Sequence, residues 1–192
     1  MLPRLRAALF PNSSRLYLEE FLREAAAEAA HSGAHSGAHS GARVLDLGAG
    51  DGRYKALFAG ARYEATDFGK LDKLYGDLDV VADLVALPIA PAAYDLLVCT
   101  QVMEHLPDPA AALRQMHAAL RPGGTLWLTA PLYFEEHEQP YDFYRYTRFG
   151  LRHLFEQAGL RIERLEPLEG YYGALAHQLR FAAAHLPLRP AD

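Results

Sequence analysis

The sequence predicts an α/β protein with a Rossmann-like, doubly wound and mainly parallel sheet that carries helices on both faces. Strand-like and helix-like segments alternate between residues 43 and 166, which is typical of βαβ units around a parallel sheet. The first of these strands runs directly into three glycines at alternate positions, Gly48, Gly50 and Gly52. Such a turn lets a ligand approach the backbone closely, as in doubly wound folds that bind nucleotides.

The first predicted element is a helix over residues 14–30, where apolar residues recur at i, i+3, i+4 and i+7. Three His-Ser-Gly-Ala repeats follow in residues 31–42, and a glycine in each repeat disfavours a helix by about 1 kcal/mol. On a helix these histidines would share one face and could hold a metal, but the glycines favour a flexible linker. We expect the helix over residues 1–30 to act as a lid and the linker as its hinge.

The remaining elements follow from local signals in residues 43–192. Asp108 and Pro109 predict the start of a helix, and Gly159 predicts the end of another that begins near Thr147. Residues 122–124, Pro-Gly-Gly, predict a turn into a strand. Strands are expected at 44–47, 62–66, 80–83, 95–100, 125–129 and 160–165, a helix at 52–59, and a helical tail in 167–192. A convincing seventh strand is missing.

Length and composition indicate one globular domain over residues 1–192, with 51% hydrophobic and 22% charged residues. The net charge of −5 argues against a nucleic-acid surface. One cysteine, Cys99, excludes an intramolecular disulfide and fits a reducing compartment. Because no apolar run is long enough to span a bilayer and the N-terminus lacks the apolar centre of a signal peptide, we expect a cytoplasmic protein without a membrane span.

Acidic residues at two further strand ends predict a nucleoside cofactor. Asp67 lies 19 residues after Gly48, where a carboxylate can accept hydrogen bonds from ribose hydroxyls. Phe68 beside it can pack on an adenine, and Asp83 can accept from an exocyclic amine. A nicotinamide fingerprint would need a glycine at position 53, which is Arg53, so a dinucleotide oxidoreductase is disfavoured.

The ordered motifs at 44–52 (VLDLGAGDG), 65–67 (ATD), 82–88, 94–98 (YDLLV), 104–106 (EHL) and 120–126 (LRPGGTL) resemble class I S-adenosylmethionine-dependent methyltransferases. The resemblance implies S-adenosylmethionine as cofactor, S-adenosylhomocysteine as product and strand order 3-2-1-4-5-7-6, with the seventh strand antiparallel. The sequence departs from this pattern in lacking a convincing seventh strand. It implies cofactor contacts in three groups. These are Asp46, Gly48, Ala49 and Gly50 on the methionine part with Thr100 and Gln101 flanking it, Asp67 and Phe68 at the adenosine, and Asp83 with Leu84 at the adenine.

Two histidines are candidate bases for removing a proton from an acceptor. His105 follows the fourth strand, close to the expected position of the methyl group, and His137 lies in the segment after the fifth. His105 could instead only pack or cap its turn. Glu104 and His105 could also be two ligands of a divalent metal, but no third ligand is evident, so no metal is predicted.

The segment 133–146 is dense in aromatic residues and resembles a methyltransferase type 11-like bacterial subgroup that is associated with glycan or natural-product biosynthesis. It supplies the candidate substrate-binding residues Tyr133, Tyr144, Arg145 and Tyr146, although these side chains could merely pack the loop, with Arg145 paired to an acid. The resulting prediction is methyl transfer to an oxygen or nitrogen of a small-molecule or glycan acceptor. The alternative is a regulatory protein that binds the cofactor without methylating.

Overall fold

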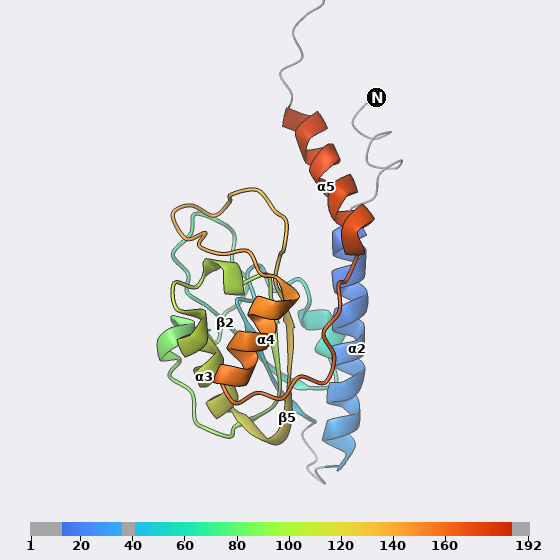
Figure 1. The fold of residues 1–192 in the computed structure, drawn as a ribbon. Helices are drawn as coiled ribbons and strands as arrows, with labels where there is room; N and C mark the ends of the chain where they lie inside the picture. Colours follow the sequence, from blue (N-terminus) through green and yellow to red (C-terminus); the bar gives the residue numbers. More distant parts are fainter. Residues whose placement is uncertain (1–12, 36–40, 186–192) are drawn as a thin grey trace, which may run out of the picture. The chain divides into compact units, whose positions relative to one another are not determined.

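The computed structural model describes residues 13–35 and 41–185 (Figure 1). Its contacts group the chain into two compact units, whereas the sequence analysis predicts a single domain. Of the described residues, the larger unit contains those within 22–165, and the smaller one contains 13–21 and 166–185. The sheet and all the predicted site residues belong to the larger unit.

A sheet of five parallel strands, ordered β3-β2-β1-β4-β5, forms the centre of the larger unit (Figure 1). The strand order reverses between β1 and β4, and ligands of doubly wound proteins bind at the carboxyl ends of the strands at such a point. The strands are β1 (Arg43–Leu47), β2 (Arg62–Asp67), β3 (Val80–Val81), β4 (Tyr94–Thr100) and β5 (Leu120–Thr129).

Strand β4 is buried on both faces of the sheet. Leu97 and Cys99 belong to the main hydrophobic cluster on one face. Leu96 and Val98 alternate with them and are at most 1% exposed, and Trp127 of β5 lies beside Val98 in register. Burial on both faces explains why this strand is a continuous apolar run in the sequence.

Helices α3 (Pro109–Ala119) and α4 (Arg148–Gln157) pack their apolar residues into the main hydrophobic cluster. Both begin as predicted. The Asp108 carboxylate accepts a hydrogen bond of 2.9 Å from the Ala111 amide, with Pro109 in the first turn. The Thr147 hydroxyl caps α4 by accepting from the Gly150 amide at 3.1 Å.

Helix α2 (Ser13–His35) is longer than predicted and joins the core of the larger unit. Leu22, Ala25 and Ala29 are at most 1% exposed, and the Glu28 carboxylate accepts a hydrogen bond of 2.9 Å from the Trp127 indole. This half of α2 is therefore packed into the core of the larger unit, and its role as a lid stays a prediction. The linker prediction is wrong for residues 31–35, because adding turns to an existing helix is cooperative and offsets the cost of one glycine; residues 36–40 lie outside the described residues.

Four predicted elements after β1 differ from the structure. The Pro-Gly-Gly segment at 122–124 is not a turn before the strand but part of β5, which begins at Leu120. Residues 52–59 form only the short 3₁₀ helix η1 (Lys55–Phe58), and the third strand has two residues. Residues 160–165 form no strand, and within the described residues the sheet ends at β5 without a sixth or an antiparallel seventh strand. Side-chain contacts hold this segment instead: the Arg164 guanidinium pairs with Glu24 at 2.7 Å and lies 5.5 Å from the Trp127 ring centre.

The smaller unit contains the predicted C-terminal helix, α5 (Gly170–His185). It exposes large apolar side chains, among them Tyr172 at 83% and Leu179 at 62%. In the described part of the chain, no helix is both long and apolar enough to cross a membrane.

Candidate active site

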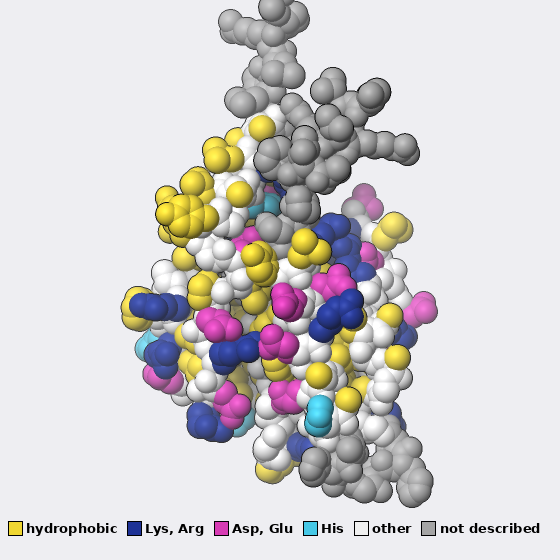
Figure 2. Space-filling model, turned by 90° about the vertical axis from the view of Figure 1, so that its right-hand side faces the viewer, with side chains coloured by type: hydrophobic (Ala, Val, Ile, Leu, Met, Phe, Trp, Pro, Cys, Tyr) yellow, Lys and Arg dark blue, Asp and Glu magenta, His cyan; other side chains and the backbone are white. Residues whose placement is uncertain are grey.

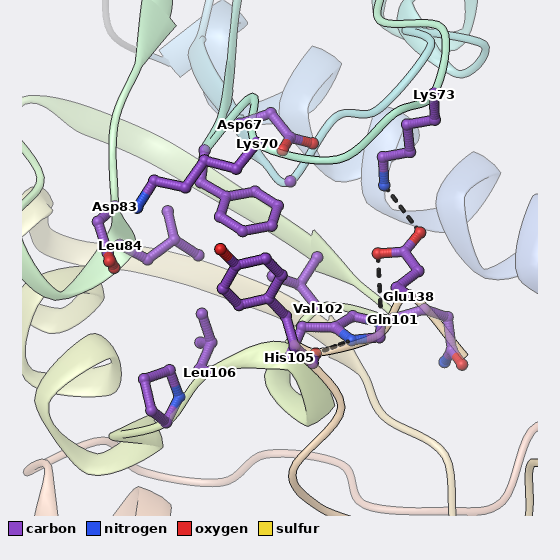
Figure 3. A pocket seen from close by; sticks show the side chains of 14 residues that line it. Asp67, Lys70, Lys73, Asp83, Leu84, Gln101, Val102, His105, Leu106 and Glu138 are labelled. Carbon is purple, nitrogen blue, oxygen red and sulfur yellow. Dashed lines mark hydrogen bonds and ion pairs between the residues drawn. The ribbon is translucent and has the colours of Figure 1, made fainter. Parts of the chain in front are cut away.

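A pocket opens at the carboxyl ends of β1, β2 and β4, where the sequence predicts the cofactor (Figure 3). Of the predicted site residues, six cofactor residues and one candidate base line it. These are Gly48, Asp67, Phe68, Asp83, Leu84, Gln101 and His105. Lys70, Lys73, Val102, Leu106, Pro107, Glu138 and Tyr141 complete the lining.

Gly48 can occupy its position only because it lacks a side chain. Its φ is +76°, and a Cβ there would lie 2.3 Å from Val102 Cγ2. The amides of Gly48 and Ala49 donate to the Thr66 carbonyl at 2.8 and 3.0 Å. The turn is thus fastened to β2, and these two N–H groups are not free to bind a ligand. The turn brings bare backbone to the pocket wall, which is the cradle that an adenosine-containing cofactor requires.

Asp67 ends β2 and is 5% exposed. Its Oδ2 accepts from the Gly50 amide at 3.1 Å and its Oδ1 from the Gly69 amide at 3.3 Å. Because a carboxylate has about four acceptor positions, each oxygen keeps capacity for a ribose hydroxyl. The residues present fit the predicted cofactor on this side of the pocket.

Phe68 lies at the same end of the pocket. Its ring meets that of Tyr141 edge to face at 5.2 Å, and the Lys70 ammonium lies 5.9 Å from its centre. Asp83 accepts from the Val85 amide at 3.1 Å and caps the 3₁₀ helix η2 (Leu84–Ala86). Side chains that can pack on and hydrogen-bond a purine are therefore gathered here.

Four predicted cofactor residues do not line the pocket: Asp46, Ala49, Gly50 and Thr100. Asp46 is 3% exposed and accepts a short hydrogen bond from the Tyr63 hydroxyl. Burial raises the pKa of its carboxyl to about 6. Gly50 supports the site indirectly through its bond to Asp67.

His105 lines the pocket from the segment after β4, in the 3₁₀ helix η3 (Met103–His105). Its Nδ1 is 2.6 Å from the Tyr141 carbonyl, which only accepts, so Nδ1 carries the proton and Nε2 keeps a lone pair. Nε2 lies 3.7 Å from Glu138 Oε2 and 3.9 Å from Glu104 Oε1. Burial lowers the pKa of the His105 imidazole, which favours its neutral form.

His137 does not line the pocket, but it packs directly against His105. The two ring centres are 4.7 Å apart in an edge-to-face arrangement. His137 Nδ1 is 3.1 Å from the Glu135 carbonyl and 3.4 Å from Asp142 Oδ2. The structure therefore brings together two candidate bases that are far apart in sequence.

The four predicted substrate-binding residues lie outside the pocket lining. The Arg145 guanidinium binds the Asp142 carboxylate at 2.6 and 2.9 Å and the Phe134 and Glu135 carbonyls. Tyr146 is 7% exposed and donates to the Met103 carbonyl at 2.8 Å. These two residues hold the segment in place, as the alternative interpretation of the sequence has it. Tyr133 and Tyr144 are 59% and 41% exposed.

Sequence reasoning missed several pocket residues. Lys73 donates to Glu138 at 2.8 Å and so links the loop after β2 to the segment after β5 across the pocket (Figure 3). Tyr141 contributes both its ring and the carbonyl that orients His105. The aromatic density of 133–146 signalled the importance of that segment but not which of its residues face inward, and nothing in the sequence singled out Lys70 or Lys73.

Comparisons with known proteins identify the family of the chain. A family model described as a methyltransferase domain matches residues 14–165. The ubiquinone biosynthesis O-methyltransferase of Xanthomonas campestris pv. campestris (strain B100) is 36% identical, in a match that covers 46% of this chain and 42% of that protein. The chain therefore spans less than half the length of the curated relatives it matches.

Two solved structures illustrate the shared fold. A SAM-dependent methyltransferase from Aquifex aeolicus has a TM-score of 0.51 at 20% identity, over 83% of this chain and 84% of that one. The [4+2]-cyclase SpnF has a TM-score of 0.58 at 19% identity, over 84% and 68%. Since the family model spans most of the chain, the protein belongs to the methyltransferase-domain family, and it has the fold of the class I S-adenosylmethionine-dependent methyltransferases.

Proposed function

We propose that this chain transfers the methyl group of S-adenosylmethionine to an oxygen, or alternatively a nitrogen, of a small-molecule or glycan acceptor in the cytoplasm. The observation that supports this best is the composition of the pocket at the carboxyl ends of the strands. Acceptors for a ribose and a purine, Asp67 and Asp83, line it together with a neutral imidazole, His105.

On the cofactor side, Asp67 would accept hydrogen bonds from the ribose hydroxyls, and Phe68 with Leu84 would pack on the adenine. Asp83 would accept from the exocyclic amine. When bound, S-adenosylmethionine supplies an electrophilic methyl group on its sulfonium, so the protein's own tasks are to align the acceptor, exclude water and manage the acceptor's proton. Lys73 and Glu138 would help exclude water, because their ion pair crosses the pocket.

On the acceptor side, His105 and His137 would activate the nucleophile. His105 presents a lone pair on Nε2, because its other nitrogen is engaged with the Tyr141 carbonyl. An oxygen nucleophile needs such help, since a neutral hydroxyl attacks poorly. The names of the curated relatives, which are O-methyltransferases, also support an oxygen acceptor.

A small acceptor is favoured over a nucleic acid. Acidic and basic side chains are interspersed on the face that Figure 2 presents, without a broad basic area. The net charge is −5. Nucleic-acid binding depends on clustered lysine and arginine.

The test is a methyl-transfer assay with S-adenosylmethionine and a panel of hydroxylated and phenolic acceptors, combined with a comparison of S-adenosylhomocysteine and NAD binding. We expect S-adenosylhomocysteine but not NAD to bind, and at least one acceptor to be methylated. We expect His105→Ala to lower turnover strongly while S-adenosylhomocysteine binding stays within a few-fold. Binding of NAD alone would refute the proposal.

The second candidate is a protein that binds the cofactor without methylating. The likeness to the [4+2]-cyclase SpnF motivates it, because a protein with that printed activity shares the fold. This candidate predicts that S-adenosylhomocysteine binds but that no acceptor in the panel is methylated.

A further inference from the structure

We propose that Glu104, His105 and His137 together bind a divalent transition-metal cation at the acceptor end of the pocket. One ligand atom from each residue lies within 4.8 Å of the other two. The binding itself is independent of the proposed methyl transfer. Only the role of the cation rests on that function: when bound, it would hold and activate an acceptor oxygen in place of the His105 Nε2 lone pair, which would then be a ligand and not the base.

The strongest observation is the state of Glu104. Its side chain is 1% exposed, and neither carboxylate oxygen has a hydrogen-bond partner. A buried carboxyl without partners costs several kcal/mol, and such groups in proteins are normally paired, hydrogen-bonded or bound to a metal. The carboxylate lies beside His105 Nε2, at 3.9 Å from Oε1, so a cation between them would satisfy it.

Both histidines are oriented as metal ligands are. His105 donates from Nδ1 to the Tyr141 carbonyl, and His137 Nδ1 faces the Glu135 carbonyl and Asp142. A metal-binding histidine characteristically donates its other ring N–H to a carbonyl or carboxylate, which fixes the tautomer and the ring plane. The Nε2 atom of each ring is thereby left with a lone pair.

The spacing is close to what a cation needs. Bonds of about 2.0–2.2 Å place two ligand atoms of one cation up to about 4.4 Å apart, and the 3.9 Å between His105 Nε2 and Glu104 Oε1 lies inside this range. The side chain of His137 is 29% exposed, so a small rotation can bring it into the coordination sphere without disturbing the core.

The ligand set selects the kind of cation. Two imidazoles and one carboxylate suit Zn²⁺, Co²⁺, Fe²⁺ or Mn²⁺ better than Mg²⁺ or Ca²⁺, which prefer oxygen ligands alone. Three protein ligands also leave coordination positions open. Because His105 lines the pocket, we expect an open position to face it, where an acceptor hydroxyl would bind and lose its proton more easily.

The experiment is a titration of the chain of residues 1–192 with Zn²⁺ and with Co²⁺ in the absence of cofactor, with binding measured by calorimetry and by the visible absorption of bound Co²⁺. His31, His35 and His39 of the repeat are replaced by alanine in every sample, so that they cannot contribute ligands. We expect one cation per chain. Glu104→Gln, which keeps the side-chain shape, and His137→Ala should each weaken binding at least tenfold.

Two further variants separate a cation site from a merely structural cluster. Asp142→Asn should weaken Zn²⁺ binding about 10- to 100-fold, because residues that orient a ligand have effects of that size. His153→Ala, an exposed histidine on α4, should leave it unchanged. Thermal unfolding of each variant without metal identifies any variant that fails to fold. If His137→Ala does not fold, Glu104→Gln still tests the site.

No bound Zn²⁺ or Co²⁺, or equal affinity in the parent, Glu104→Gln and His137→Ala proteins, would overturn the cation site. S-adenosylhomocysteine binding to the same samples keeps the two proposals apart. If the protein binds Co²⁺ through Glu104 but does not bind S-adenosylhomocysteine, the cation site stands and the methyl-transfer proposal is refuted. If it binds S-adenosylhomocysteine but no cation, the methyl-transfer proposal stands and the cation site is refuted.

Discussion

Replacing Gly48 by alanine tests the close approach between the glycine turn and the loop after β4. A Cβ at position 48 would lie 2.3 Å from Val102 Cγ2, where carbon atoms normally approach no closer than about 3.5 Å. The φ of +76° adds strain of about 1–2 kcal/mol for an alanine. Overpacking of this kind costs about 1–3 kcal/mol, so we expect Gly48→Ala to lower the free energy of unfolding by about 2–5 kcal/mol.

Gly50 supplies the matched control. Its φ is +56°, also left-handed, but nothing lies within 4 Å of a Cβ built there. Gly50→Ala should therefore lower the free energy of unfolding only by the backbone strain, about 1–2 kcal/mol. The difference between the two variants isolates the steric overlap with Val102.

Urea denaturation of four proteins measures this directly: the parent, each single alanine variant, and Gly48→Ala combined with Val102→Ala. Removing both Val102 methyl groups leaves only its Cβ at 3.3 Å from the new side chain, so the double variant should be more stable than additivity of Gly48→Ala and Val102→Ala predicts. Because Gly48 and Val102 both line the pocket, Gly48→Ala should also weaken S-adenosylhomocysteine binding about tenfold or more, and Gly50→Ala much less. Equal losses of stability at positions 48 and 50, or strict additivity with Val102→Ala, would refute the argument.

Two further predictions concern buried polar groups. Burial raises the pKa of Asp46 from 3.8 to about 6 in the folded protein. The free energy of unfolding therefore falls as pH rises from about 4 to 6, by about 3 kcal/mol in total. Below about pH 4 the carboxyl is protonated in both states and has no such effect. Asp46→Asn should therefore raise the free energy of unfolding by up to about 3 kcal/mol at pH 7.5 and change it little at pH 4, and an equal effect at both pH values in urea titrations would contradict this. Tyr146→Phe removes the hydroxyl bonded to the Met103 carbonyl and should cost about 1–2 kcal/mol of stability without changing the acceptor KM, whereas a raised KM with unchanged stability would restore Tyr146 to the substrate site.

Much of the fold could be predicted because its signals are local. The start of α3 follows from Asp108 and Pro109, and the first parallel strands follow from apolar runs that end in glycine or an acid. The cofactor side of the site follows from the same signals, since Gly48 and Asp67 stand at strand ends that any doubly wound sheet brings together.

The rest depends on contacts between distant residues, which local patterns do not encode. Residues 160–165 alternate like a strand, but Arg164 binds Glu24 and lies over Trp127 instead. Residues 31–35 of the repeat continue α2 because the preceding helix is already formed. The pairing of His137 with His105 depends on how Arg145 and Asp142 fasten the segment after β5, which no spacing in the sequence reveals.

The central claim is that the pocket beside Asp67 binds the adenosine of the cofactor, and calorimetric titration of S-adenosylhomocysteine into the parent protein and Asp67→Ala tests it most directly. Two hydrogen bonds to a charged group are worth about 1.5–3 kcal/mol each, so the variant should bind about 10²- to 10⁴-fold more weakly. Circular dichroism should show that it keeps its secondary structure. A parent protein that does not bind S-adenosylhomocysteine, or a folded Asp67→Ala protein that binds it as tightly as the parent, would contradict the account.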